Sequence, residues 1–352
     1  MYYIGCLTHI TYIGLDHLGQ LLTTEFKKTT DCWWLGAVKE IVDPQCLNLQ
    51  LEVIKHYAIK VGQDFKKINL VVNTTIDTDD IHCDFNIFSL DTFRAIVYYY
   101  KHYAEQKFST QYNPCDKVLF LIGKPDRIHR TPLLIELIQR NLKENLLYSW
   151  YPTAPGDHVF NRVLKTVNES PYKNIDLVNF SKIHTQLLDV LETSLTNNSK
   201  TNFHYSGFPF DCSLFEQTSI SLVSETDLRS NPLWLTEKIW KTVANHHPFI
   251  IAGPAGLASH LRKQGYETWD SFLIHDQDEA NSYWYTNPKK GLEMVVDNVD
   301  FFIKNNYAKN NLNELAQYNS DLLDIHVQQD IEKNFKSIDT FKTFINRVIF
   351  SV

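Results

Sequence analysis

The chain contains 352 residues, which is more than one average domain needs and enough for two, and its hydrophobic fraction of 43% supports a sizeable core. Its formal net charge of −7 gives no overall attraction for phosphate polymers. A dedicated nucleic-acid-binding protein is therefore disfavoured, and any contact with nucleic acid would depend on a local basic patch.

Cysteine spacing and the amino-terminal residues indicate the cellular compartment. Six cysteines are scattered without a C-x-x-C pair, which argues against a zinc knuckle and favours free thiols in a reducing cytosol. The opening residues lack the basic and apolar blocks of a signal peptide, and no apolar run reaches the length of a membrane span. We therefore expect a soluble cytoplasmic protein without a membrane-spanning segment.

Apolar runs rich in β-branched and aromatic residues predict strands, and segments of helical periodicity lie between several of them. The predicted strands are 2–7, 68–76, 117–123, 219–224 and 247–253. The predicted helices are 131–143, 179–195, 235–245 and 256–265, followed by an almost wholly helical stretch from Gly291 onward. Strands that alternate with helices indicate βαβ units, so the predicted fold class is α/β with parallel sheets.

A turn-rich stretch, YNPCDK at 112–117, interrupts this pattern just before a predicted strand. Such stretches commonly separate domains, so a boundary is expected there. We expect a first domain at 1–112, a second at 113–285, and a helical tail at 286–352 that packs back on the first domain.

The loop GKPDRIHR at 123–130 joins a predicted strand to a predicted helix. Thr131 as N-cap and Pro132 in the first helical position predict the helix start. Orphan N–H groups and the helix dipole attract anions at such a start, and they disfavour cations. Phosphate binding is therefore favoured over a solvated basic loop. The lysine, arginine and histidine residues of the loop are Lys124, Arg127, His129 and Arg130.

A second strand end carries charged residues. The strand at 219–224 is followed by Glu225 and a polar loop that leads into another predicted helix. Thr236 is placed to cap this helix, which puts Glu237 in the first turn, where an acid is favourable. Lys238 follows, and capping does not explain a cation at this end. Two interpretations stay open, a well-capped helix start and a pair of ligand-binding side chains.

Four segments carry a family resemblance: S-E-T at 224–226, T-E-K-x-W at 236–240, H-P-F-I-I-A-G-P at 247–254, and L-A-S-H-L-R-K-Q-G-Y-E-T-W at 257–269. In this order they resemble the donor-binding half of glycosyltransferase-B enzymes. They are most similar to the alpha-1,3-fucosyltransferase family and to related glycosyltransferase-like proteins of large phages and giant viruses. The basic loop with the helix after it resembles the first βα unit of the same half. The resemblance covers roughly residues 115–270.

The resemblance implies two Rossmann-like domains that face a cleft, with a helical carboxyl-terminal tail. Residues 1–112 would hold the acceptor and residues 113–285 the nucleotide-sugar donor. The implied reaction moves a sugar from a nucleotide-diphosphate donor to a hydroxyl of a glycan or, for a phage-encoded enzyme, of a hydroxylated DNA base. The nucleotide-sugar is a substrate, no metal or cofactor is essential, and a viral enzyme would act in the host cytoplasm.

The resemblance also implies roles for single residues. Glu237 would bind the ribose hydroxyls, and Lys238 would lie near the phosphates. Arg127 or Arg130 would clamp the diphosphate. Three roles stay open for Glu225, namely contact with the donor sugar, ordering of Lys238, or a buried structural acid.

The catalytic base of an inverting transferase is a carboxylate or histidine that deprotonates the acceptor hydroxyl. Asp16 and His17, in the loop after the first predicted strand, are the candidates, with Asp16 preferred, and ordinary loop solvation or capping is the alternative. Asp77 and Asp79 form a D-x-D pattern that could hold a metal in a metal-dependent transferase, although a solvated acidic turn is the commoner explanation. A non-catalytic protein that binds a nucleotide or glycan is the other alternative.

Overall fold

The chain divides into two compact units in a computed structural model. Unit 1 consists of Met1–Ala104 together with Asp324–Val352, and unit 2 consists of Glu105–Leu323. The structure describes residues 2–4, 33–37, 44–60, 62, 64, 68–72, 85–122, 129–149, 210–226, 228, 233, 235–305 and 312–350.

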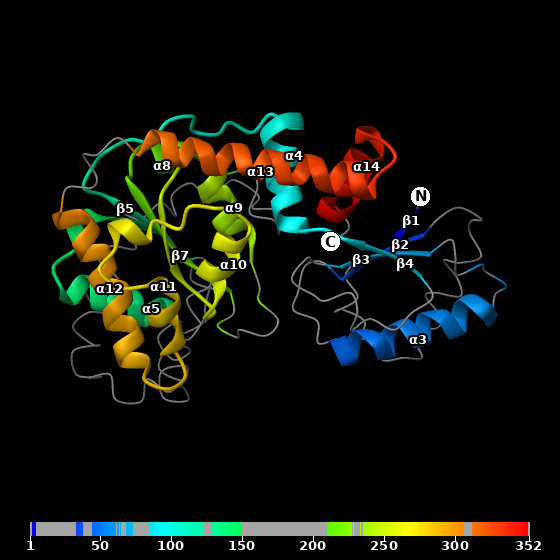
Figure 1. Cartoon of the computed structure of the whole chain (residues 1–352), viewed down its shortest axis with the longest axis horizontal. Helices are drawn as coiled ribbons and strands as arrows, with labels where there is room; N and C mark the ends of the chain where they lie inside the picture. The colour runs from blue at the N-terminus through cyan, green and yellow to red at the C-terminus, as the bar shows by residue number, and fades with distance from the viewer. Residues whose placement is uncertain are drawn as a thin grey trace, which may run out of the picture. The chain divides into compact units, whose positions relative to one another are not determined.

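Unit 1 contains a four-stranded parallel sheet (Figure 1). Its strands are β1 (Tyr2–Ile4), β2 (Trp33–Ala37), β3 (Ile68–Val72) and β4 (Asn86–Ser89). They lie in the order β1-β2-β3-β4, which is also their order in the chain, with Leu35 opposite Leu70. The described strands of this sheet contain no reversal of order, so a Rossmann-like arrangement of this unit stays a prediction.

Helices from both ends of the chain pack in unit 1. They are α3 (Pro44–Lys60), α4 (Thr92–Tyr103) and α14 (Ile338–Phe350). Asp91 caps α4, because its Oδ1 accepts a hydrogen bond from the N–H of Arg94 at 3.0 Å. α14 packs against α4 and β1, and it buries Phe341 and Phe344. The last helix of the chain therefore belongs to the core of the first unit.

Unit 2 contains a second four-stranded parallel sheet. Its strands are β5 (Val118–Leu121), β6 (Leu146–Ser149), β7 (Ile220–Ser224) and β8 (Phe249–Ala252). Their order is β6-β5-β7-β8, so the chain runs outward from β5 to β6 and then to β7 and β8 on the opposite side. The strand order therefore reverses between β5 and β7, which makes this position a topological switch point.

Six α-helices are described in unit 2 alone: α5 (Arg130–Gln139), α8 (Ser213–Glu216), α9 (Glu237–Ala244), α10 (Leu257–Lys263), α11 (Gln277–Ser282) and α12 (Pro288–Lys304). Short 3-10 helices occupy Lys143–Asn145 and Asp270–Phe272. In Figure 1, α12 lies beside α5 and α11, and it also packs against β8, whereas α9 packs against β7. Trp240, Trp269 and Trp284 are fully buried among these elements.

The start of α5 differs from the expected one. The helix begins at Arg130 with His129 in the N-cap position, rather than with Thr131 as the cap. No side chain caps it. Pro132 nevertheless lies in the first turn, where its missing N–H is tolerated. Arg130 thus belongs to the helix itself and not to the loop before it.

The segment expected as a single tail, 286–352, is divided between the units. α12 and the first part of α13 (Asn313–Asn334) belong to unit 2, and α13 from Asp324 onward belongs to unit 1 with α14. In unit 1, Asp330 Oδ2 accepts from Arg94 Nη2 at 3.1 Å, and Asp324 Oδ2 accepts from Lys101 Nζ at 2.9 Å. Two ion pairs thus join the end of the chain to α4.

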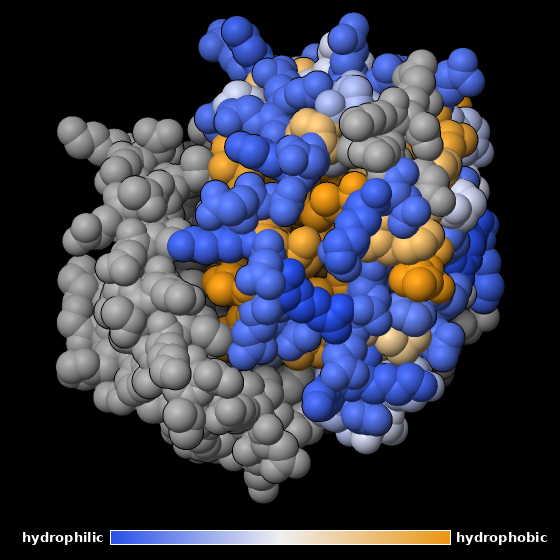
Figure 2. Space-filling view, turned by 90° about the vertical axis from the view of Figure 1, so that its left-hand side faces the viewer, coloured by the Kyte–Doolittle hydropathy of each residue, from blue (hydrophilic) through white to orange (hydrophobic). Residues whose placement is uncertain are grey.

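None of the described helices is long and apolar enough to cross a membrane. Figure 2 shows one face of the molecule, on which hydrophobic side chains lie in patches that hydrophilic side chains separate. The exposed large hydrophobic residues in the described ranges are Ile59, Tyr103, Ile274, Tyr285, Tyr318 and Ile325. They are distributed over both units, and single exposed residues of this kind are normal on a protein surface.

Candidate functional site

The carboxyl ends of β5, β7 and β8 lie side by side in the unit 2 sheet. In open parallel α/β sheets, ligands bind beyond this edge, and they favour the switch point, where adjacent loops leave in opposite directions. The chain leaves the three strands at Ile122, Glu225 and Gly253. The candidate site consists of the residues that follow these strands and of the helix N-termini next to them.

Arg130, at the start of α5, joins the ends of β5 and β7. Its guanidinium donates to the carbonyl oxygen of Ile122 at 2.9 Å and to the hydroxyl and carbonyl oxygens of Ser224 at 3.1 and 3.2 Å. It also donates to the carbonyl oxygen of Glu225 at 3.3 Å. The residue is 3% exposed. These contacts hold the switch point together, and the role of Arg130 as a diphosphate clamp stays a prediction.

His129 lies at the same place, also buried. Its Nε2 is 2.8 Å from Ser224 Oγ, and its ring centroid is 5.8 Å from that of Trp284. The sequence pattern grouped His129 with the basic residues of the loop before α5. In the structure the imidazole instead contacts the end of β7 and an aromatic ring of the core.

Glu225 and Thr236 connect the end of β7 to the N-terminus of α9. Glu225 Oε2 accepts from Thr236 Oγ1 at 2.6 Å, and Oε1 accepts from Thr236 N at 3.3 Å. Thr236 Oγ1 accepts from the N–H of Lys238 at 3.4 Å, as the sequence predicted for the cap of this helix. A buried carboxylate and a hydroxyl therefore satisfy orphan donors at one helix start.

The Glu225 side chain is fully buried, and this burial raises the pKa of its carboxyl group. The charge of Lys238 and the hydrogen bonds from Thr236 act in the opposite direction. Gly253 leaves room for this side chain, because a Cβ at that position would lie 3.2 Å from Glu225 Cβ. The Gly253 N–H donates to Asn281 Oδ1 at 3.0 Å, which fixes the end of β8 beside Glu225.

Lys238 lies in the first turn of α9 with its ammonium held by neighbouring oxygens. Nζ donates to Thr226 Oγ1 and to Thr236 Oγ1, both at 3.0 Å, and it is 3.9 Å from Glu225 Oε2. Its side chain is 21% exposed. The positive charge is thus fixed at the switch-point edge, next to the positive end of the helix dipole.

Glu237 precedes Lys238 and is also half-buried. Among the residues that the structure describes, no hydrogen bond or ion pair involves its carboxylate. An acid in the first turn is stabilised by the helix dipole, and its oxygens can accept hydrogen bonds from a ligand. The first turn of α9 therefore carries one carboxylate without a hydrogen-bond partner among the described residues, which interacts electrostatically with Lys241, and one fixed ammonium.

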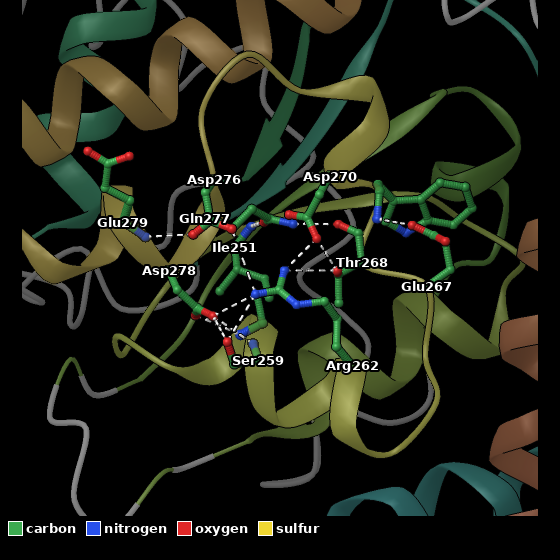
Figure 3. A network of polar contacts seen from close by, with 12 residues as sticks. Ile251, Ser259, Arg262, Glu267, Thr268, Asp270, Asp276, Gln277, Asp278 and Glu279 are labelled. Carbon is green, nitrogen blue, oxygen red and sulfur yellow. Dashed lines mark hydrogen bonds and ion pairs between the residues drawn. The ribbon is translucent and has the colours of Figure 1, made fainter.

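A dense polar network lies next to this edge, between α10 and α11 (Figure 3). Arg262 contacts three carboxylates: Asp270, Asp276 and Asp278. Asp278 also accepts from the N–H groups of Ala258 and Ser259 at the start of α10, and Gln277 Oε1 accepts from the N–H of Ile251 at 2.6 Å. These contacts cap a helix and hold β8. The segment at 257–269 that carries part of the resemblance includes Ser259 and Arg262, but it did not predict these contacts.

Several predicted residues lie outside the described part of the chain: Asp16, His17, Lys124, Arg127, and the D-x-D residues Asp77 and Asp79. Within the described part, no three His, Cys, Asp or Glu residues are grouped so that they could hold a metal ion. The four other predicted site residues lie together at one edge of the unit 2 sheet: Arg130, Glu225, Glu237 and Lys238.

Comparison of the chain with protein-family models, with curated proteins and with solved structures gives no match. Parallel α/β sheets carry many unrelated functions, so the fold class alone does not choose among them. Function is therefore inferred from the residues at the edge of the sheet and from the motifs that surround the T-E-K sequence.

Proposed function

We propose that the chain is a glycosyltransferase whose nucleotide-sugar donor binds at the carboxyl edge of the unit 2 sheet. The observation that carries the proposal is the pair Glu237 and Lys238 in the first turn of α9, beside the switch point between β5 and β7. A carboxylate can accept two hydrogen bonds from the ribose hydroxyls, and an adjacent ammonium can lie near the diphosphate. The resemblance of the motifs to glycosyltransferase-B enzymes supports the same arrangement.

The proposed leaving group is a nucleoside diphosphate, and its negative charge increases as the bond between the sugar and the phosphate oxygen breaks. The N-terminus of α9, Lys238, and the loop cations Lys124 and Arg127 would stabilise this charge. The acceptor hydroxyl attacks the sugar carbon and loses its proton to a base, for which Asp16 is the candidate. We propose that these protein groups suffice without an essential metal or cofactor.

The proposed architecture is that of a glycosyltransferase-B enzyme with two Rossmann-like domains, the acceptor bound by 1–112 and the donor by 113–285. The acceptor is a glycan or, in a phage or viral setting, a hydroxylated DNA base in the host cytoplasm. An acidic chain holds a DNA duplex only through local cations, so such binding weakens steeply with salt. A duplex-binding assay at low salt, with the donor present, separates the two acceptors.

Thermal denaturation with a panel of nucleotide-sugars tests the donor directly. A donor at 100 times its dissociation constant should stabilise the protein by about 2.7 kcal/mol. Turnover with that donor should survive EDTA, because protein cations stabilise the leaving group. Loss of turnover on chelation, restored by manganese or magnesium, would favour the D-x-D alternative. Binding without turnover would favour a non-catalytic protein.

Replacing Glu237 with alanine should weaken nucleotide binding by about 1–3 kcal/mol, the scale of hydrogen bonds to a charged group. The stability of unit 2 should change little, because the Glu237 carboxylate has no hydrogen-bond partner in the described residues and Thr236 still caps the helix. Isothermal titration calorimetry measures the affinity. Glu293→Ala, which removes a surface acid on α12, is the control. Unchanged affinity in Glu237→Ala would reduce Glu237 to a helix-start residue.

A further inference from the structure

Glu225 and Lys238 share one hydrogen-bond partner at the N-terminus of α9, the hydroxyl of Thr236. Thr236 Oγ1 lies 2.6 Å from Glu225 Oε2 and 3.0 Å from Lys238 Nζ. We propose that Glu225 is a positioning residue, which holds the ammonium of Lys238 in place and does not itself touch the donor. The use of Lys238 in donor binding rests on the proposed function, whereas its placement by Glu225 rests on these contacts alone.

The hydroxyl of Thr236 has one hydrogen, which it donates to Glu225. Its lone pairs are therefore directed toward the donors on its other side, Lys238 Nζ and Lys238 N. The carboxylate also accepts from the Thr236 backbone N–H, so both the side chain and the backbone of the cap residue are fixed. Glu225 therefore fixes the orientation of the Thr236 hydroxyl, which accepts a hydrogen bond from the Lys238 ammonium.

Charge supports the same assignment. A fully buried carboxylate requires a nearby cation or several hydrogen bonds, and Lys238 Nζ is 3.9 Å from Glu225 Oε2. The Lys238 ammonium in turn has the Glu225 carboxylate nearby, and it donates hydrogen bonds to the hydroxyl oxygens of two threonines. The pair is therefore matched in charge while only the lysine reaches the surface.

Packing excludes a direct contact between Glu225 and a sugar in this arrangement. The residue has no exposed surface. Its Cβ and Cγ lie against Gly253, and its carbonyl oxygen accepts from Arg130. Of the three roles open from the sequence, contact with the donor sugar is disfavoured. If Glu225 positions Lys238, its replacement changes the reactivity of the Lys238 amine. If Glu225 is a purely structural acid, that reactivity stays the same.

Competitive amine labelling with mass spectrometry measures that state in the full-length protein without a ligand. Glu225→Gln leaves one acceptor oxygen, turns an NH₂ donor toward groups that are themselves donors, and removes the counter-charge. We expect the labelling rate of Lys238 to rise at least fivefold, because the neutral amine is the nucleophile and the loss of the counter-charge no longer favours the ammonium. Lys289, whose side chain is 85% exposed, is the internal reference. Asp278→Asn is the matched control, a carboxylate-to-amide change on α11 at a side chain that accepts from N–H groups at the start of α10.

A Lys238 labelling rate that is equal in the wild type, Glu225→Gln and Asp278→Asn would overturn the proposal. If Glu225→Gln does not fold, Gly253→Ala serves instead, since its Cβ would lie 3.2 Å from Glu225 Cβ and 3.3 Å from Cγ, which forces a small shift of the Glu225 side chain without removing its charge. It should raise the labelling rate of Lys238 in the same direction, and an unchanged rate would overturn the proposal equally.

Donor affinity separates this proposal from the proposed function. Glu225→Gln should weaken nucleotide-sugar binding about tenfold when Lys238 is present. In a Lys238→Met background the same substitution should weaken it less than about twofold, because its effect acts through Lys238. Equal effects in both backgrounds would contradict a positioning role even if binding occurs. If the wild type binds no nucleotide-sugar while Lys238 labelling rises as expected, the proposed function fails and the positioning of Lys238 by Glu225 stands.

Discussion

Replacing Arg130 with leucine is expected to lower the free energy of unfolding of unit 2 by about 3–5 kcal/mol. Arg130 is 3% exposed, and its guanidinium donates to oxygens of Ile122, Ser224 and Glu225. Leucine cannot donate, so buried acceptors at the ends of β5 and β7 lose a partner, at about 1–3 kcal/mol each where water cannot reach them. Hydrogen exchange of the β5 and β7 amides under increasing denaturant measures the loss.

Arg140→Leu is the matched control for this prediction. Arg140 is also on the α5 segment, but its side chain is 27% exposed, and it pairs with Glu136 and Asp297 near the surface. We expect its loss to cost about 1 kcal/mol or less. If Arg130→Leu lowered the free energy of unfolding no more than this control does, and nucleotide affinity fell sharply, the main role of Arg130 would be to bind the diphosphate. Its contacts between β5 and β7 would then contribute little to stability.

Replacing Asp330 with leucine is expected to destabilise unit 1 by a similar amount, about 3–5 kcal/mol. Asp330 pairs with Arg94 at 3.1 Å, and the two side chains are 19% and 6% exposed. The substitution leaves a buried guanidinium without this carboxylate, and removing one partner of a buried pair costs more than the pair itself contributes. Faster hydrogen exchange of the α4 amides would report the effect within unit 1 and separate it from unit 2.

Glu332→Leu controls for a change of charge on the same helix. Glu332 is exposed on α13, so we expect an effect within about 0.5 kcal/mol. The double variant Arg94→Met/Asp330→Leu should recover much of the stability, because two packed apolar side chains can replace a buried ion pair. A neutral result for Asp330→Leu alone would mean that this ion pair does not hold the end of the chain on α4.

The sequence predicted the strands of unit 2 better than those of unit 1. β5, β7 and β8 lie within the predicted runs, because each is a continuous apolar segment bounded by turn residues. β2 and β4 were not predicted, since WWLGA and NIFS are short and have no clear periodicity. α4 was not predicted either. It contains three consecutive tyrosines, which favour strands, and tertiary packing overrides that preference.

Strand order and burial were beyond prediction from local pattern. The switch point between β5 and β7 depends on which strands pair, and a sequence pattern does not specify this. The N-cap role of Thr236 was predictable because it uses neighbouring residues. The contacts of Arg130 with Ser224 and Glu225 were not, because they join residues 94 and 95 positions apart. A basic residue at a helix start indicated a phosphate site, and this role of Arg130 stays a prediction, whereas its buried contacts with the ends of β5 and β7 are known only from the structure.

The membership of α13 in both units has a consequence for synthesis. Unit 1 needs residues from Asp324 onward, which the ribosome makes after the whole of unit 2. At the usual rate of elongation, the first 104 residues wait roughly 10–40 s for these partners. We infer that unit 2 completes its fold first and that the early strands of unit 1 stay without α14 until that helix has been synthesised. During this interval the nascent chain exposes the apolar surface that Phe341 and Phe344 later cover, and exposed apolar surface of this kind favours aggregation.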